Sequence, residues 1–157
     1  MGDTIRNPIW VNLIQVKNLL SFFYQLNLMK AGISGTMIAS NLSLSNVENS
    51  TINAFSGQNS ASFSGGIVGH KNSGSILGNC ACVTSTILSV GNETYSGGIS
   101  GRSEDNLVEH SSSSSNTITS NSPSGDAYAS GVIGSNKGTI RYCSSINNNI
   151  TSFGRID

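Results

Sequence analysis

A six-residue glycine motif occurs four times in this chain at a nearly constant spacing. Its clearest copies are residues 64–69 (SGGIVG) and 96–101 (SGGISG), and weaker copies lie at 30–35 (KAGISG) and 129–134 (ASGVIG). The second glycine of the motif returns after 34, 32 and 33 residues, at Gly32, Gly66, Gly98 and Gly131. A fixed period of this length is the signature of a repeat architecture, in which one structural unit stacks on the next.

Each repeat carries aliphatic residues at fixed distances behind the glycine motif. We predict one strand through the motif and a second that begins at Leu42, Ile76, Leu107 and Ile140. A third is predicted around Ile52, Ile87, Ile118 and Ile150, with an additional inward position between the two at Val47, Val83 and Ile146. Three short strands per unit of about 33 residues are typical of a parallel β-helix. The predicted fold is therefore all-β, a right-handed parallel β-helix (β-solenoid) with three strands per coil, its hand following from the rule for parallel crossovers.

The first part of the chain differs from the repeats. Residues 1–29 are predicted to form an irregular first turn or cap, and the coils are predicted to span about 30–63, 64–95, 96–128 and 129–157. A capping helix is an alternative, because one helical face would carry Ile9, Leu13, Val16, Leu20 and Phe23. The segment lacks the features of a signal peptide, and polar residues interrupt it too often for a membrane span.

Polar segments are predicted to turn the chain between strands. Residues 69–74 (GHKNSG) and 134–138 (GSNKG) are predicted as tight turns, because Gly and Asn adopt positive φ angles readily. The run Ser111–Ser115 could be a flexible linker, but its spacing favours a strand of small residues in the third full coil. A serine would then take the inward position that Val83 and Ile146 take in neighbouring coils, so this coil should have the weakest core.

The composition excludes some partners. Charged residues make up 10% of the chain and the formal net charge is zero, so there is no basic patch to attract a nucleic acid. Ser, Thr, Asn and Gly replace the usual charged residues, and this composition suits short strands and tight turns better than helices. We predict no nucleic-acid partner and no membrane span.

Three cysteines offer a weak signal for a metal site. Cys80, Cys82 and Cys143 are an odd number and do not match a paired zinc-binding spacing. Cys80 and Cys82 could bind a metal together with His70 or His110, since thiolate and imidazole suit zinc or copper. We favour the alternative that Cys80 and Cys143 occupy equivalent inward positions, and we predict no metal and no cofactor.

Catalysis by a β-helix, as in polysaccharide lyases and hydrolases, needs acidic and basic groups gathered on one face. The chain has eight acidic residues, and they do not recur at one position of the repeat. The one local cluster comprises Arg102, Glu104, Asp105, Glu109 and His110. We interpret it as a solvated turn and predict that the protein is not an enzyme.

One polar pattern does recur on the predicted exterior. If the isoleucines of the third strand point inward, their neighbours on both sides point outward. The resulting ladder is rich in Thr and Asn, although Leu88 interrupts it, and we predict a possible binding face at Thr51, Asn53, Thr86, Thr117, Thr119, Asn149 and Thr151. The high β propensity of Thr is the alternative explanation of the pattern.

The repeats also resemble known families. Residues 65–69 (GGIVG), followed by 74–76 (GSI) and Asn79-Cys80, resemble the GLUG-type repeat. Residues 55–59 (FSGQN), followed by 65–67 (GGI), are similar to repeats of chlamydial polymorphic membrane proteins. The resemblance covers about residues 30 to 150 and implies a β-helical microbial surface protein, often linked to adhesion. The export signal and anchor usual in such proteins are not recognisable in this chain.

These observations predict a non-enzymatic structural or adhesive module of a cell surface or extracellular assembly. The expected partner is a protein or glycan surface, or a second copy bound end to end, because a β-helix has unpaired strand edges at its ends. An alternative is ice binding through the Thr/Asn ladder, and a carbohydrate-active enzyme is a third possibility.

Overall fold

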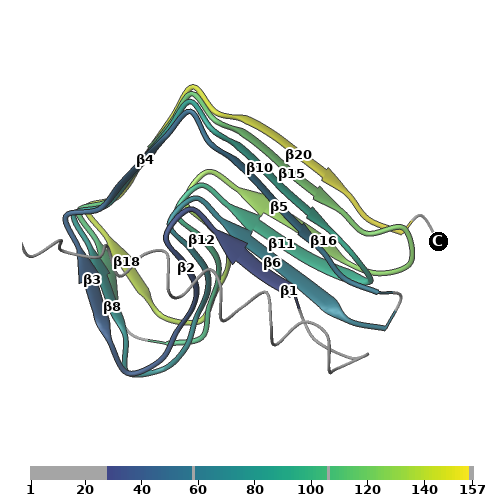
Figure 1. Cartoon of the computed structure of the whole chain (residues 1–157), viewed down its shortest axis with the longest axis horizontal. Helices are drawn as coiled ribbons and strands as arrows, with labels where there is room; N and C mark the ends of the chain where they lie inside the picture. The colour runs from purple at the N-terminus through teal and green to yellow at the C-terminus, as the bar shows by residue number, and fades with distance from the viewer. Residues whose placement is uncertain (1–27, 58, 106, 156–157) are drawn as a thin grey trace, which may run out of the picture.

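The computed structural model describes residues 28–57, 59–105 and 107–155. All the regular secondary structure within these ranges is β-strand, arranged as four stacked coils of five strands each (Figure 1). The first coil contains β1 (Leu28–Ala31), β2 (Ser34–Met37), β3 (Asn41–Ser43), β4 (Asn46–Glu48) and β5 (Thr51–Phe55). The second contains β6 (Ala61–Gly65), β7 (Val68–Lys71), β8 (Ile76–Gly78), β9 (Ala81–Val83) and β10 (Thr86–Val90).

The last two coils repeat this order. The third contains β11 (Glu93–Gly97), β12 (Ser100–Ser103), β13 (Leu107–Glu109), β14 (Ser112–Ser114) and β15 (Thr117–Asn121). The fourth contains β16 (Ala127–Ser130), β17 (Ile133–Asn136), β18 (Thr139–Arg141), β19 (Ser144–Ile146) and β20 (Asn149–Phe153). The helix or first turn expected for residues 1–29 lies, up to residue 27, outside the described residues. In the part that the structure describes, no helix has the length and apolar character needed to cross a membrane.

Equivalent strands of successive coils pair in parallel and form five four-stranded sheets. We name them sheet A (β1, β6, β11, β16), sheet B (β2, β7, β12, β17), sheet C (β3, β8, β13, β18), sheet D (β4, β9, β14, β19) and sheet E (β5, β10, β15, β20). The predicted parallel β-solenoid is thereby confirmed. The prediction of three strands per coil is wrong, because two of the three predicted strands are each divided by a corner.

The glycine motif marks the corner between sheets A and B. The chain bends at residues 66–67 instead of continuing as one strand, and Figure 1 shows that this corner turns toward the inside of the coil. The second glycine there faces the inward column of sheet D: a Cβ on Gly66 would lie 2.7 Å from Cβ of Cys82, and one on Gly32 would lie 2.6 Å from Cγ2 of Val47. The repeat keeps this glycine because the opposite wall leaves no room for a side chain.

Two further corners use residues with positive φ. Between sheets C and D these are Leu44, Asn79, His110 and Tyr142, and between sheets D and E they are Asn49, Thr84, Ser115 and Asn147. Asn tolerates this backbone region, but Thr and Leu adopt it rarely. The second expected strand is therefore split, and only the third, in sheet E, runs undivided.

The corner between sheets D and E is closed by buried polar side chains. The Asn116 amide accepts the backbone N–H of Ser85 at 2.7 Å and donates to the carbonyl of Cys82 at 2.9 Å. The Asn148 amide accepts the N–H of Asn116 at 2.9 Å in the same way. At this corner, a side chain of each of these coils thus accepts a hydrogen bond from a backbone N–H of the preceding coil.

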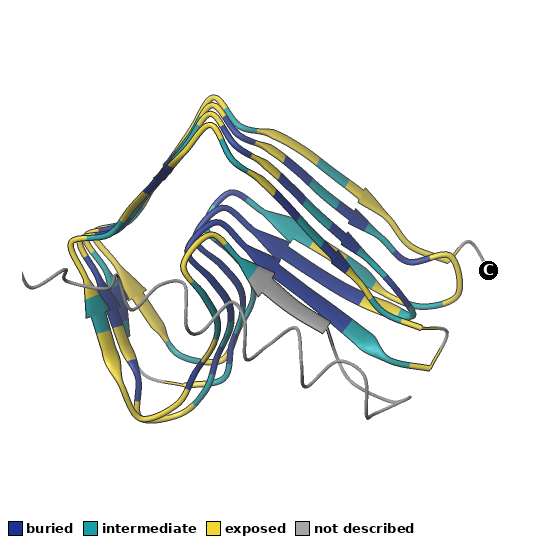
Figure 2. Cartoon of the chain, viewed as in Figure 1, coloured by how far each residue is buried: buried dark blue, intermediate teal, exposed yellow. Residues whose placement is uncertain are grey.

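The interior is apolar in one region and hydroxyl-rich in another. Apolar side chains from sheets B to E and from the glycine corner form a continuous core that includes Ile52, Ile67, Leu77, Ile87, Ile99, Val108 and Ile118. Where sheets A and E face each other, buried hydroxyls bond across the gap: Ser89 Oγ donates to Ser62 Oγ at 2.9 Å, and Ser120 Oγ donates to Thr94 Oγ1 at 2.8 Å. Figure 2 shows buried positions alternating with exposed or half-buried ones along sheet E, whereas β6 and β11 of sheet A are buried over most of their length.

Two predicted columns combine inward and outward positions, because Leu42, Ile140 and Val47 lie in inward columns and the other members do not. Leu42 pairs with Leu77, so Ile76 points outward, and Leu77 pairs with Val108, so Leu107 points outward as well. Val47 pairs with Cys82, which places Val83 and Ile146 on the exterior in the column of Glu48. Adjacent apolar residues such as Ile76 and Leu77 satisfy either register, so the pattern alone could not select the correct one.

The run Ser111–Ser115 contains a strand and is not a flexible linker. Its central residue, Ser113, continues the inward column of Cys82 in the third coil. Its hydroxyl accepts the Asn116 amide at 3.0 Å. The expectation of a strand of small residues is confirmed, but the neighbours of its inward serine are Cys82 and Ser145, not Val83 and Ile146.

The predicted turn at residues 69–74 is partly wrong. Strand β7 continues through Lys71, whose side chain is 0% exposed and whose Nζ donates to the backbone carbonyl of Asp105. Strand β17 likewise extends to Asn136, within the other predicted turn. In the sequence, a lysine flanked by glycine, histidine and asparagine indicates a turn. Only the position of the opposite wall of the coil shows that the Lys71 side chain is buried.

Candidate binding surfaces

The outer face of sheet E carries the ladder predicted from the sequence. The pairing registers align Thr51, Thr86, Thr117 and Asn149 in one column. They align Asn53, Leu88, Thr119 and Thr151 in the next. The first column is exposed and the second half-buried, whereas the intervening Ile52, Ile87 and Ile118 are buried. The structure therefore brings all seven predicted residues onto one face.

A third column of the same face was missed by the sequence reasoning. Phe55, Val90, Asn121 and Phe153 lie two residues beyond the second column and also point outward. Strand alternation predicts their outward direction too, because they lie two residues after the second column in each strand. No residue of sheet E is charged, so the face combines hydroxyl and amide groups with scattered apolar side chains.

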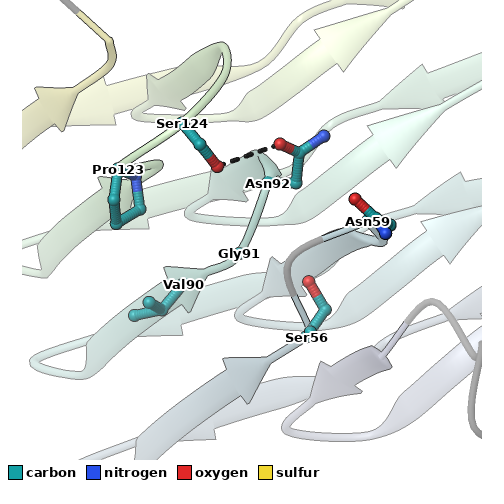
Figure 3. Close-up of a pocket in the computed structure, with 8 residues that line it drawn as sticks. Ser56, Asn59, Val90, Gly91, Asn92, Pro123 and Ser124 are labelled. Atoms are coloured by element: carbon teal, nitrogen blue, oxygen red, sulfur yellow. Dashed lines mark hydrogen bonds between the residues drawn. The ribbon is translucent and has the colours of Figure 1, made fainter.

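A shallow pocket of about 470 Å³ adjoins this face, where the loops from sheet E to sheet A stack on one another (Figure 3). Asn92 lines this pocket, and its Oδ1 accepts a hydrogen bond from the Ser124 hydroxyl at 3.0 Å. The rest of the wall is formed by Ser56, Gly57, Asn59, Val90, Gly91 and Pro123. The lining offers neutral hydrogen-bonding groups and two small apolar side chains, but no acid or base for catalysis.

A second surface feature fills the recess where the corner between sheets A and B turns inward. Phe63, Tyr95 and Tyr128 stack with ring centroids 5.2 and 5.0 Å apart. His70 stacks on Phe63 at 5.0 Å, and the Arg102 guanidinium lies 5.4 Å from the Tyr95 ring. The aromatic residues always precede the second glycine by three positions, a signal that the sequence analysis overlooked. Because these side chains cover one another, the recess is packed rather than open.

Charges around this recess neutralise one another. Glu104 lies 2.5 Å from Arg102 Nε, 2.9 Å from Lys137 Nζ and 3.6 Å from His70 Nε2. The hydrogen bond from Lys137 lowers the pKa of Glu104, and burial lowers the pKa of His70. Burial, reinforced by the neighbouring Glu93, raises the pKa of Tyr95 to about 12. These groups stabilise the packing of the recess.

The predicted charged cluster is divided between two places. Arg102 and Glu104 belong to the recess, whereas Glu109 pairs with Arg141 at 2.9 Å and lies 3.7 Å from His110 at the edge of sheet C. The interpretation as a single solvated turn is therefore wrong. Neither half faces the pocket.

The cysteines occupy small-residue positions of the fold. Cys80 and Cys143 are equivalent, and each Sγ donates to the carbonyl two residues earlier, at 3.3 and 3.4 Å. Burial raises the pKa of both Cys80 and Cys82, which keeps them as thiols. His110 stacks on Tyr142, and across residues 28–57, 59–105 and 107–155 no three His, Cys, Asp or Glu side chains gather as metal ligands.

Comparison with known proteins finds no matching protein-family model, no matching curated protein and no matching solved structure. The resemblance to GLUG-type repeats therefore stays a prediction that rests on the residues quoted for it.

Proposed function

We propose that this chain is a non-enzymatic structural or adhesive β-solenoid module that works at a cell surface or in an extracellular assembly. The observation that carries the proposal is the uncharged outer face of sheet E, whose polar residues stay in register through four coils. Hydroxyl and amide groups interspersed with apolar side chains suit a neutral partner that combines hydrogen bonds with apolar contact, such as a glycan or an uncharged protein surface.

The distribution of ionisable groups supports the same proposal. The acids and bases around the recess pair with one another, and the pocket beside sheet E has a neutral lining. Acid–base catalysis instead requires titratable groups held within reach of a bound substrate.

Binding of the purified protein to arrays of neutral glycans and to immobilised extracellular-matrix proteins tests the proposal. Thr117→Lys, at the exposed centre of sheet E, should abolish binding to any partner that the wild type recognises. Ser114→Lys introduces the same side chain on the outer side of sheet D and should leave binding intact. Absence of binding throughout, or equal loss in both variants, would argue against sheet E as an adhesive face. Antibody labelling of intact and permeabilised cells tests the surface location.

Ice binding is a second candidate, favoured by one specific observation. Thr51, Thr86 and Thr117 are identical exposed residues in consecutive coils, which lie about 4.8 Å apart. Leu88 and Asn149 interrupt the array, so we rank this function second. Thermal hysteresis that disappears in Thr117→Tyr but persists in Ser114→Tyr would establish it in place of adhesion.

A further inference from the structure

The loops that lead from sheet E to sheet A differ in length. Loop 56–60 joins the first coil to the second and loop 122–126 joins the third to the fourth, and each is three residues longer than loop 91–92 between them. Because the coils stack in sequence order, the short loop forms the floor of a cleft and the two long loops form its walls. The pocket of about 470 Å³ beside sheet E is this cleft (Figure 3).

Glycine keeps the floor of the cleft low. A Cβ on Gly91 would collide with Oγ of Ser56, so a side chain has no room at this position. A Cβ on Gly125 would likewise collide with the backbone carbonyl of Asn92. The three loops therefore pack against one another through their backbones, which leaves the space above the short loop open.

Hydrogen bonds within the long loops hold both walls in place. In one wall, Ser56 Oγ donates to the carbonyl of Ser60 at 2.7 Å, and the N–H of Ser60 donates to the carbonyl of Gly57 at 3.1 Å. In the other wall, the N–H of Gly125 donates to Ser122 Oγ at 3.0 Å. A site whose walls are already ordered loses little conformational entropy when a ligand binds.

The lining of the cleft suits a sugar. Within the described residues, the Asn92 Nδ2 group and the Asn59 side-chain amide have no hydrogen-bond partner, whereas the Asn92 Oδ1 accepts the Ser124 hydroxyl. An amide both donates and accepts hydrogen bonds, as each hydroxyl group of a sugar does. Val90 and Pro123 add apolar surface against which the C–H groups of a sugar ring can pack.

The charges around the cleft disfavour an anionic ligand. No described residue that lines it is charged, so the lining offers no counter-ion to a carboxylate or a sulfate. Glu93 follows the floor directly, and Asp126 ends one wall. Their carboxylates accept hydrogen bonds from tyrosine hydroxyls of sheet A at 3.1 and 3.2 Å, and they would repel an anion. A neutral ligand is therefore favoured.

The cleft adjoins the outer face of sheet E. Val90 belongs to both, because it lines the cleft and also lies in the outward column of Phe55 and Asn121. Phe55 directly precedes Ser56 of the cleft wall and is 51% exposed. A ligand longer than one sugar ring would therefore continue from the cleft onto this face.

We propose that the cleft binds one pyranose ring of a neutral glycan, and that further rings of the same glycan lie on the outer face of sheet E. The cleft volume lies within the range of roughly 300–1,000 Å³ that is usual for small-molecule sites. This inference rests on the proposed function, because it gives the adhesive face a ligand class and an anchoring site.

Titration of the full chain with neutral di- and trisaccharides of hexose and N-acetylhexosamine units tests the proposal. The backbone amide signals of Gly91 and Asn92 should shift in NMR spectra, while that of Ser114, in sheet D, should not. The corresponding uronic acid saccharides should bind about tenfold more weakly, because the lining holds no counter-ion and carboxylates flank the loops.

A substitution that fills the cleft supplies a matched test. Gly57 lines the cleft and a Cβ there meets no atom within 4 Å, so Gly57→Trp adds a bulky side chain without a clash at its Cβ. It should weaken saccharide binding about tenfold. Asn59→Leu keeps the volume but leaves a ligand hydroxyl unpaired, and should weaken binding to a similar degree. Ser114→Trp should bind as the wild type does, and circular dichroism checks that each variant folds.

The variants separate the cleft from the adhesive face. Saccharide binding that Thr117→Lys abolishes, but that Gly57→Trp and Asn59→Leu leave unchanged, would overturn the cleft site and leave sheet E as the adhesive face. A preference for uronic acid saccharides, or shifts confined to residues outside the cleft, would overturn it too. A wild type that binds a matrix protein but no saccharide at millimolar concentration would overturn the cleft site while the adhesive function stands.

Discussion

Neighbouring residues in this chain have opposite environments, as Thr86 and Ile87 illustrate. Thr86 is exposed on sheet E, whereas the Ile87 side chain is completely buried between Ile52 and Ile118. Strand alternation alone separates them. Strand alternation also places the Lys71 side chain inside the coil. Its ammonium group donates a hydrogen bond there to a backbone carbonyl.

Substitution of each of these neighbours by aspartate should have very different effects. Ile87→Asp should unfold the domain, because an unpaired carboxylate would be buried in the core. Thr86→Asp should change the free energy of unfolding by no more than about 0.5 kcal/mol, as at an ordinary surface site. Urea denaturation of both variants measures this, and equal effects would refute the inward and outward assignment.

His70 should make stability depend on pH. Burial lowers its pKa below the ordinary 6.5, although Glu104 opposes the shift and Arg102 adds to it. The unfolded chain therefore binds more protons just below pH 6.5, and the free energy of unfolding should fall as the pH drops through this value. Urea denaturation at about pH 8 and pH 5.5 should show this loss, with a smaller loss in His70→Gln. His110→Gln serves as the control, and a loss that persists unchanged in His70→Gln would contradict the assignment.

At the scale of elements, the corners determine the shape of each coil. The A–B corner turns inward because glycine at Gly66 lets the backbone approach Cys82 and the next coil. The two outward corners use residues with positive φ, and the corner between sheets D and E is closed by the side chains of Ser85, Asn116 and Asn148. Strands between these corners are as short as three residues, so the corners, rather than strand propensity, decide where each sheet begins.

Adding one methyl group at the inward corner tests this account. Gly66→Ala would bring a Cβ to within 2.7 Å of Cys82 Cβ and against the carbonyl of Gly98, and should cost roughly 1–3 kcal/mol through overpacking. Gly57→Ala meets no atom within 4 Å and should be neutral or slightly stabilising. Thermal unfolding of the two variants provides the comparison, and a neutral Gly66→Ala would show that the corner can open.

The molecule as a whole is a one-dimensional stack, and each coil contacts only its neighbours. In such repeats the free energy of unfolding is approximately a sum. Each unit contributes its intrinsic stability, and each interface between neighbouring units contributes a further stabilising term. The inner coils have two interfaces, while the fourth coil, as the structure describes it, has one.

As the structure describes them, β20 should therefore be locally less stable than β15 in dilute solution. Amides of β15 that bond to a neighbouring coil should exchange more slowly than those of β20, because β20 is held on one side only. Hydrogen exchange monitored by NMR at low micromolar concentration measures the difference. Uniform protection would indicate that the stack unfolds as one unit.

The sequence by itself determined the repeat, the parallel β-solenoid and the direction of the side chains in sheet E. A period near 33 residues and the isoleucine column at Ile52, Ile87 and Ile118 were sufficient, because strand alternation is local and the isoleucines have polar neighbours on nearly every side. The Thr/Asn ladder followed from the same local rule.

The tertiary structure alone decided the five-strand coil, the inward columns of sheets C and D, and the burial of Lys71. Paired apolar residues such as Ile76 and Leu77 fit either register, and only contact with the facing wall selects one. The inward corner likewise depends on how Gly66 meets Cys82, two residues from different sheets. These features arise from contacts across the coil, which the local periodicity of the sequence does not encode.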